Sequence, residues 1–155
     1  ENTTDPCSTR INGMIPPTDR IAPLKKRDGT PVRVLVVDDS IFMEKHMSRI
    51  LTGAGFEVVG TAMDGEQAIA MFAKLKPDIT TMDITMPKVD GIHAIDEIFK
   101  ADPAAVIIPL TAIGHEKIVR TLLAKGVKHY IVKPIQPDRV VEIVRDIAMK
   151  YVLKI

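Results

Sequence analysis

The stretch VRVLVVDDS, residues 32–40, combines a short β-branched run with two acids and a serine. A continuous apolar run of this kind is typical of a strand that is buried on both faces of a sheet. Ser40 is a suitable N-cap, and apolar residues from Phe42 to Leu51 then recur at helical spacing until Gly53. The stretch therefore predicts a buried strand that leads directly into a helix.

The same strand-then-helix signal recurs along the rest of the chain. Short apolar runs occupy residues 56–61, 78–82, 105–110 and 127–132. Helical patterns follow them, with starts or ends predicted at Asp64, Pro77, Pro103, Gly126 and Pro137. Five strands that alternate with five helices predict an α/β fold with a doubly wound parallel sheet.

Residues 1–31 show neither pattern. They are rich in Pro, Thr, Asn and Gly, and their apolar residues are scattered. We therefore predict a flexible or partly ordered N-terminal tail or linker over 1–31, followed by one domain over 32–155. The basic run at 25–27 is most simply a solvated charge run. Because the first residue is Glu rather than Met, we expect a fragment or a processed chain, and an upstream domain remains open.

The composition restricts the classes of function. The formal net charge is +1 with 26% charged residues, which gives no electrostatic argument for a nucleic-acid partner. No apolar run is long enough for membrane insertion, and the N-terminus lacks the apolar stretch of a signal peptide. Cys7 is the only cysteine, so an intramolecular disulfide is excluded and a structural zinc site is disfavoured. These features predict a cytoplasmic protein.

Polar side chains stand at the carboxyl ends of four predicted strands. Asp38 and Asp39 end the first strand, Asp83 the third, Thr111 the fourth and Lys133 the fifth. Parallel strands bring these ends to one edge, where three carboxylates repel one another unless a cation neutralises them. Oxygen ligands at a wet edge favour Mg²⁺, and a lysine with a hydroxyl suits a phosphoryl group. Each residue alone could be a turn former or a cap, but together they favour phosphoryl transfer to a carboxylate nucleophile.

Four motifs, LVVDDS, MDITMPKVDG, LTA and YIVKP, occur in this order between residues 35 and 134. In this respect the chain from Val32 onward resembles the receiver domain of two-component response regulators, especially the single-domain chemotaxis (CheY-like) type. The resemblance implies a flavodoxin-like five-stranded parallel sheet of order 2-1-3-4-5 flanked by five helices. It also implies a phosphoacceptor signalling protein rather than an enzyme. Its partners would be a histidine kinase and a downstream target, such as a flagellar motor switch or a phosphotransfer protein.

The resemblance also implies a metal and phosphoryl site. Asp83 would be the phosphoacceptor, and Asp39 and Asp83 would ligate Mg²⁺ together with the backbone carbonyl of Thr85. Asp38 would act on the metal through water.

The remaining implied roles concern the switch. Thr111 would hydrogen-bond the phosphoryl oxygen and Lys133 would pair with it. Tyr130 would be the switch aromatic whose rotation follows the movement of Thr111, so that a partner-binding face formed by the fourth helix, fifth strand and fifth helix changes state.

Two positions depart from the family pattern. Pro109 lies within the fourth strand, where a proline is disfavoured, so we expect a local irregularity just before Thr111. Ile113 is apolar and cannot orient a water molecule, so we expect dephosphorylation that relies on Mg²⁺ alone.

Alternative assignments also remain. The chain could be the receiver part of a larger regulator or hybrid kinase. A phosphatase of the haloacid dehalogenase type also uses an aspartyl nucleophile, but it requires a second Asp at the position of Thr85. A flavodoxin-like cofactor carrier must bind a phosphate in its first loop, where the acids at 38 and 39 would repel an anion. The four histidines, for which we expect solvated or core-edge positions, are His46, His93, His115 and His129.

Overall fold

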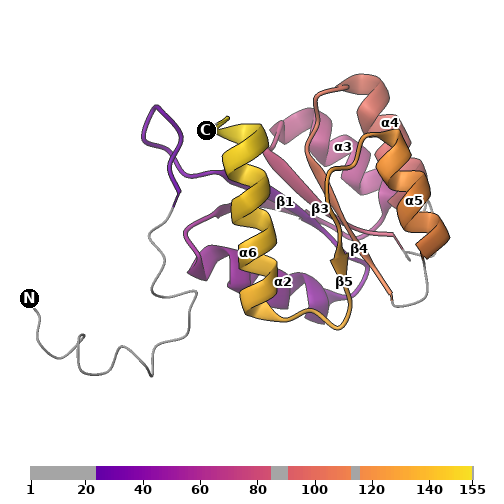
Figure 1. Cartoon of the computed structure of the whole chain (residues 1–155), viewed down its shortest axis with the longest axis horizontal. Coiled ribbons are helices and arrows are strands. Elements are labelled where there is room, and N and C mark those ends of the chain that lie inside the picture. The colour runs from indigo at the N-terminus through magenta and orange to yellow at the C-terminus, as the bar shows by residue number, and fades with distance from the viewer. Residues whose placement is uncertain (1–23, 85–90, 113–115, 155) are drawn as a thin grey trace, which may run out of the picture.

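The computed structural model describes residues 24–84, 91–112 and 116–154. A five-stranded parallel sheet forms its centre, in the order β2-β1-β3-β4-β5 (Figure 1). The strands are β1 (Arg33–Val37), β2 (Glu57–Ala62), β3 (Ile79–Asp83), β4 (Ile107–Thr111) and β5 (Ile131–Val132). The helices are α2 (Ile41–Gly53), α3 (Gly65–Leu75), α4 (Gly91–Ala101), α5 (Glu116–Lys125) and α6 (Pro137–Ile147), and α6 continues into a π-helical turn, η3 (Ala148–Val152). The predicted fold class is confirmed.

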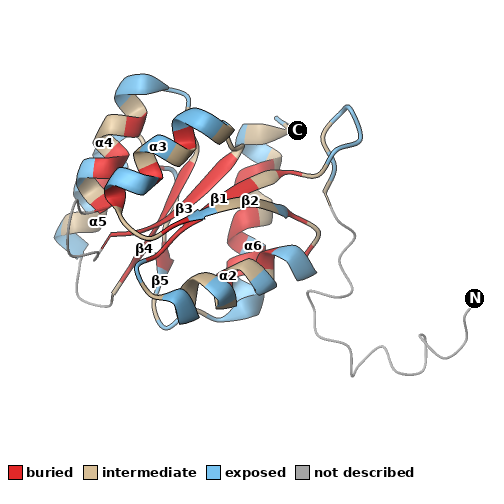
Figure 2. Ribbon diagram, turned by 180° about the vertical axis from the view of Figure 1, so that it is seen from behind, coloured by how far each residue is buried: buried red, intermediate tan, exposed pale blue. Residues whose placement is uncertain are grey.

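The sheet is buried between two helical layers (Figure 2). Val34 and Val36 of β1 pack in one core cluster with the inner faces of α2 and α6. Leu35 and Val37 point to the opposite side and pack in a second cluster with α3, α4 and α5. This alternation explains why the sequence of β1 is apolar at every position from 34 to 37, as a strand covered on both faces requires.

Local signals in the sequence start the first two helices. The Ser40 side chain accepts a hydrogen bond from Met43 N at 3.3 Å, and the Asp64 side chain accepts one from Gln67 N at 2.8 Å. These bonds satisfy backbone N–H groups that the first turn of a helix leaves without partners. Both predicted N-caps are confirmed, and each directs the chain away from the carboxyl end of the preceding strand.

The fifth strand is shorter than predicted, because its first four expected residues, 127–130, are not in the sheet. Val127 N donates instead to Leu122 O at 3.2 Å and Gly126 N donates to Leu123 O at 3.2 Å, which together close the end of α5. Gly126 has φ +118°, a left-handed conformation that favours glycine at this cap. The helix cap therefore uses backbone groups that the sequence pattern assigned to the strand.

Pro109 affects the pairing of β4 with β5 rather than the pairing of β4 with β3. Pairing between β3 and β4 continues without a register shift through Met82 and Pro109. The prediction of an irregularity within β4 is therefore wrong for its pairing with β3. Leu110 O accepts from Ile84 N next to β3, whereas Thr111 O accepts from Lys133 N next to β5. Because backbone groups of successive strand residues face opposite sides, position 109 faces β5, where proline has no N–H to donate.

Part of the predicted tail contacts the domain. Leu24 packs against the core cluster that α2 and α6 cover, and Lys25 forms an antiparallel bridge with Pro31. Lys26 Nζ lies 3.0 Å from Asp78 Oδ2, and the same oxygen accepts from Arg33 N at 2.9 Å. Residues 24–31 thus form a small hairpin at the amino-terminal edge of the sheet, near the end of the chain (Figure 1).

Within the described ranges, no helix is both long enough and apolar enough to span a membrane.

Candidate functional site

Three carboxylates meet at the carboxyl edge of the sheet, as predicted. Asp38 and Asp39 follow β1, and Asp83 is the last residue of β3. One carboxylate oxygen from each lies within 4.8 Å of the others, a spacing at which a single cation can contact all three. The parallel register of β1 and β3, in which Val37 pairs with Met82, places these strand ends side by side.

The three acids differ in exposure. Asp83 is 1% exposed and Asp38 is 3% exposed, whereas Asp39 is exposed. Lys133, which follows β5, extends to the cluster, and its Nζ lies 3.3 Å from Asp83 Oδ2. The site therefore combines two buried acids, one solvent-facing acid and one lysine.

Burial and, to a smaller extent, the negative charge of Asp83 raise the pKa of Asp38 to about 6. The Ser40 backbone N–H opposes this effect by donating to Asp38 Oδ1 at 2.9 Å. A raised pKa means that the folded protein stabilises the charged form of this carboxylate less well than water does. The arrangement is thus one that a bound cation would stabilise.

The donor set fits Mg²⁺. Hard carboxylate oxygens, with one acid open to water, match an ion that binds through a few carboxylates and retains several waters. Asp39 and Asp83 would hold the ion directly, and Asp38 lies close enough to act through a water molecule. Thr85, whose backbone carbonyl was expected to contribute, lies outside the described residues.

Gly91, the first residue of α4, packs directly on the backbone of Asp83. A Cβ at position 91 would lie 2.5 Å from Asp83 O and 2.6 Å from Ile84 Cα, distances that real Cβ atoms essentially never show. The start of α4 can therefore approach the end of β3 only because residue 91 lacks a side chain. The sequence signal was the glycine itself, placed eight positions after the acid.

Thr111 and Lys133 are linked through their backbones. Thr111 ends β4, is buried, and its carbonyl accepts a hydrogen bond from Lys133 N at 2.7 Å. Its Oγ1 donates only weakly, to Ala112 O at 3.4 Å. The hydroxyl at the edge of the site is thus held by one long hydrogen bond, which a better acceptor could replace.

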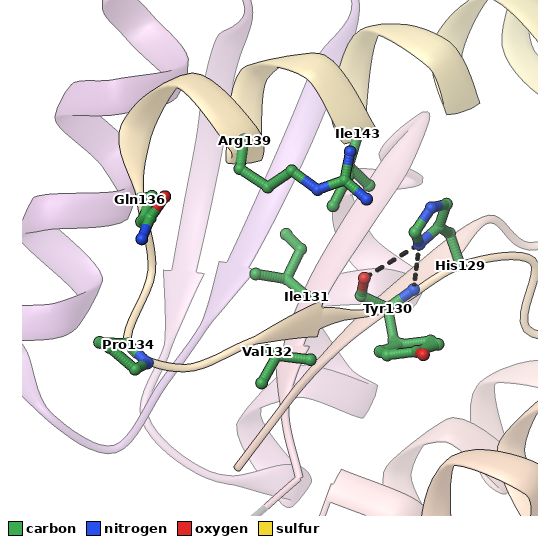
Figure 3. Close-up of a pocket in the computed structure, with 8 residues that line it drawn as sticks. All are labelled: His129, Tyr130, Ile131, Val132, Pro134, Gln136, Arg139 and Ile143. Atoms are coloured by element: carbon green, nitrogen blue, oxygen red, sulfur yellow. Dashed lines mark hydrogen bonds between the residues drawn. The ribbon is translucent and has the colours of Figure 1, made fainter. Parts of the chain in front are cut away.

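Tyr130 lines a pocket of about 270 Å³ between β5 and α6 (Figure 3). The side chain of Ile131 points toward α6, whereas those of Tyr130 and Val132 lie on the opposite side of the chain. The residues that line this pocket are His129, Tyr130, Ile131, Val132, Pro134, Gln136, Arg139 and Ile143.

Phe42, the first residue of the apolar pattern that predicted α2, does not belong to the core. It is 71% exposed and stacks on His46 with 6.2 Å between ring centroids. Ile41 beside it is 58% exposed. Both lie in the first turn of α2.

None of the three described histidines joins the acids. Among the described residues, the cluster of possible metal ligands contains only the three aspartates. His115 lies outside the described residues, as does Ile113.

Comparison with known proteins agrees with this geometry. The family model for the response regulator receiver domain matches residues 34–145. A chemotaxis protein CheY of Thermotoga maritima is 49% identical over 116 residues, which cover 75% of this chain and 97% of that protein. A CheY of Treponema pallidum is 44% identical over 126 residues, or 80% of this chain and 88% of that protein.

A solved structure shows the same similarity. A CheX–CheY–BeF₃–Mg²⁺ complex from Borrelia burgdorferi matches with 41% identity and a TM-score of 0.75, over 77% of this chain and 91% of that one. The family match sets aside the phosphatase of the haloacid dehalogenase type and the flavodoxin-like carrier. This chain belongs to the family of response regulator receiver domains, and among its relatives it is similar to the CheY chemotaxis proteins.

Proposed function

We propose that this chain accepts a phosphoryl group on Asp83 from a histidine kinase and signals through a downstream chemotaxis partner. The observation that supports this most strongly is the juxtaposition at the sheet edge of three carboxylates and a lysine, with Lys133 Nζ 3.3 Å from Asp83 Oδ2. The chain would therefore act as a signalling protein that promotes only its own phosphorylation and dephosphorylation.

In the proposed reaction, an Asp83 carboxylate oxygen forms a bond to phosphorus. The bond from phosphorus to the imidazole nitrogen of the phosphohistidine breaks, and its electron pair returns to that nitrogen. Lys133 lies where it can pair with the phosphoryl oxygens, and Asp39 and Asp38 remain as carboxylates beside it. The chemistry that bound Mg²⁺ supplies is neutralisation of the acids and of the incoming phosphoryl charge.

The product, an aspartyl phosphate, carries new acceptor oxygens close to the end of β4. Thr111 Oγ1, held only by a 3.4 Å hydrogen bond, would turn to donate to them. Movement of Thr111 would then be followed by Tyr130, and the face formed by α5, β5 and α6 would bind its partner in one state better than in the other.

The test uses acetyl phosphate or phosphoramidate with Mg²⁺ and follows intact mass. We expect the wild type to gain the mass of one phosphoryl group, the adduct to require Mg²⁺, and Asp83→Asn to gain none. Asp146→Asn, an aspartate on α6 that pairs with Lys150 Nζ at 3.2 Å, is the matched control and should be phosphorylated like the wild type. An adduct that persists in Asp83→Asn would refute the assignment.

A second test separates metal binding from transfer. BeF₃⁻ with Mg²⁺, the pair named in the Borrelia complex, should bind the wild type and not Asp39→Asn. Equal binding by both proteins would contradict the proposed role of Asp39.

A further inference from the structure

The imidazole of His129 contacts both backbone polar groups of Tyr130. His129 Nδ1 accepts a hydrogen bond from Tyr130 N at 2.8 Å and lies 2.9 Å from Tyr130 O (Figure 3). These contacts hold the backbone of the residue that precedes β5 directly. They belong neither to the acidic cluster nor to its lysine.

The sheet does not provide these hydrogen bonds at residue 130. β4 and β5 pair only through Leu110 with Ile131 and Thr111 with Val132, so the next pair in register would be Pro109 with Tyr130. Continuing the ladder would need a bond from position 109 to the His129 carbonyl, which proline cannot donate. By the alternation along a strand, the N–H and C=O of Tyr130 face the outer edge of the sheet. There the imidazole of His129 is their partner.

One ring nitrogen cannot satisfy both groups in the same protonation state. With a lone pair on Nδ1, the ring accepts a hydrogen bond from the Tyr130 N–H. The Tyr130 carbonyl oxygen, which is also an acceptor, then repels that lone pair. With a proton on Nδ1, the ring must release that N–H and can donate to the Tyr130 carbonyl instead. The two states therefore require different positions of the Tyr130 peptide groups relative to the ring.

We propose that His129 is a proton-sensitive positioning residue for Tyr130. Its neutral ring, with the proton on Nε2, holds the Tyr130 backbone N–H, and its doubly protonated ring holds the carbonyl. Histidine is the side chain whose charge ordinarily changes between pH 5 and 8, which is the range that the test covers. The consequence for signalling rests on the proposed function, because it requires that Tyr130 be the switch aromatic. The coupling of His129 to Tyr130 does not depend on the proposed function.

Two other charged side chains, Arg139 and Lys128, belong to the surroundings of His129. Arg139 of α6 lines the pocket and its guanidinium extends toward His129 (Figure 3), while its own ion-pair partner is Glu142. Lys128, next to His129 in sequence, lies with its Nζ 5.6 Å from the centre of the Tyr151 ring. The residues of β4, 107–111, contribute no titratable side chain. All of these groups are kept unchanged or conservatively replaced in the test.

The test observes the Tyr130 amide alone. The chain contains two tyrosines, so Tyr151→Phe with ¹⁵N-tyrosine labelling leaves one backbone amide signal. Phenylalanine keeps the aromatic ring under Lys128. The amide is followed by NMR from about pH 5 to about pH 7.5, without Mg²⁺ or a phosphodonor, together with the carbon-bound ring protons of the histidines.

We expect the Tyr130 amide proton to move upfield as the pH falls, because it loses its acceptor, with the same midpoint as the His129 ring signal. The ring signal is assigned by its loss in His129→Asn, whose side chain does not titrate in this range, and the amide transition should disappear in that variant. His46→Asn, which changes a histidine on α2, should leave the transition intact. A transition that persists in His129→Asn, or no transition in the parent protein, would overturn the proposal.

Two further measurements separate the remaining explanations. The pKa of Asp38 is raised to about 6, so the titration is repeated in Asp38→Asn, where the amide transition should remain. If His129→Asn does not fold, the His129 ring signal is assigned by elimination from His46→Asn, His93→Asn and His115→Asn, since the chain has four histidines. Different midpoints for that ring signal and the Tyr130 amide refute the coupling. Failure of this coupling leaves phosphorylation of Asp83 untouched, and failure of phosphorylation leaves the coupling untouched.

Discussion

Lys133 Nζ lies 3.3 Å from Asp83 Oδ2, so the cation that follows β5 is already paired with the acid that ends β3. This pair crosses β4, whose last residue, Thr111, bonds the Lys133 backbone at 2.7 Å. The lysine is thus positioned through both its side chain and its main chain, with its charge directed at the acceptor oxygen.

Lys133→Met should slow phosphorylation by small donors by roughly 10²-fold, because one preorganised charge at the transferred group is lost. Mg²⁺ binding should persist, since the three carboxylates remain. The measurement is the rate of adduct formation at saturating Mg²⁺, with Lys150→Met as a surface control. An unchanged rate would show that Lys133 does not act on the transferred group.

Gly91→Ala should destabilise the protein by about 1–3 kcal/mol, because its Cβ would overlap the backbone of Asp83 and Ile84. Gly53→Ala is the matched control, since a Cβ there meets nothing within 4 Å and alanine stabilises a helix by about 0.5–1 kcal/mol relative to glycine. Urea unfolding measures both. Equal effects of the two substitutions would show that α4 can retreat from β3 without cost.

Thr80→Val should stabilise the protein by about 1 kcal/mol, because the buried Thr80 Oγ1 has no hydrogen-bond partner and valine keeps the shape. Thr80→Ser keeps the hydroxyl, loses the methyl group and should destabilise. If both substitutions destabilise in thermal unfolding, the hydroxyl has a partner that valine removes.

The pH dependence of stability should reflect Asp38. Its folded-state pKa of about 6 lies above its unfolded-state value of about 3.9, so the folded state binds the extra proton between these values. In metal-free protein, this group therefore makes the free energy of unfolding decrease as the pH rises from about 4 to about 6.

The check is the difference between wild type and Asp38→Asn across this range without Mg²⁺. Wild type should lose stability relative to the variant as the pH rises, and Mg²⁺ should restore it near neutral pH. Mg²⁺ affinity should weaken below about pH 6, where the proton competes. A difference independent of pH would mean that Asp38 has the same pKa in both states.

The hairpin over residues 24–31 should contribute to stability, contrary to a domain that begins at residue 32. Leu24→Ala removes part of the core and should destabilise by about 1–2 kcal/mol. Lys26→Met breaks the pair with Asp78 and should cost up to about 1 kcal/mol. Lys25→Met is the control for charge alone. Melting temperatures that do not respond to Leu24→Ala would place the boundary where the sequence predicted it.

A feature of this structure could be predicted from the sequence where it depends on residues close together in the chain or on the topology of the sheet. Ser40 and Asp64 were predictable as caps, because an N-cap bonds a backbone N–H three residues away. The acidic site was predictable because parallel strands align their ends whatever their side chains. Both signals are either local or topological.

The remainder depends on contacts between distant segments. The length of β5 is limited by Pro109, on another strand, and by the cap of α5, so its own apolar pattern was misleading. The contact of Gly91 with Asp83 and the exposure of Phe42 depend on how α4 and α2 are placed against the sheet. No periodicity within a single segment contains that information.

The shortness of β5 has a consequence for how copies of the molecule meet. An edge strand normally offers a row of free N–H and C=O groups on which a strand of another chain can assemble. Here the described edge beside β4 consists of Ile131 and Val132, and His129 occupies the backbone groups of the residue before them. This side of the sheet therefore offers an incoming strand too few hydrogen bonds to align, which protects the molecule against edge-to-edge aggregation.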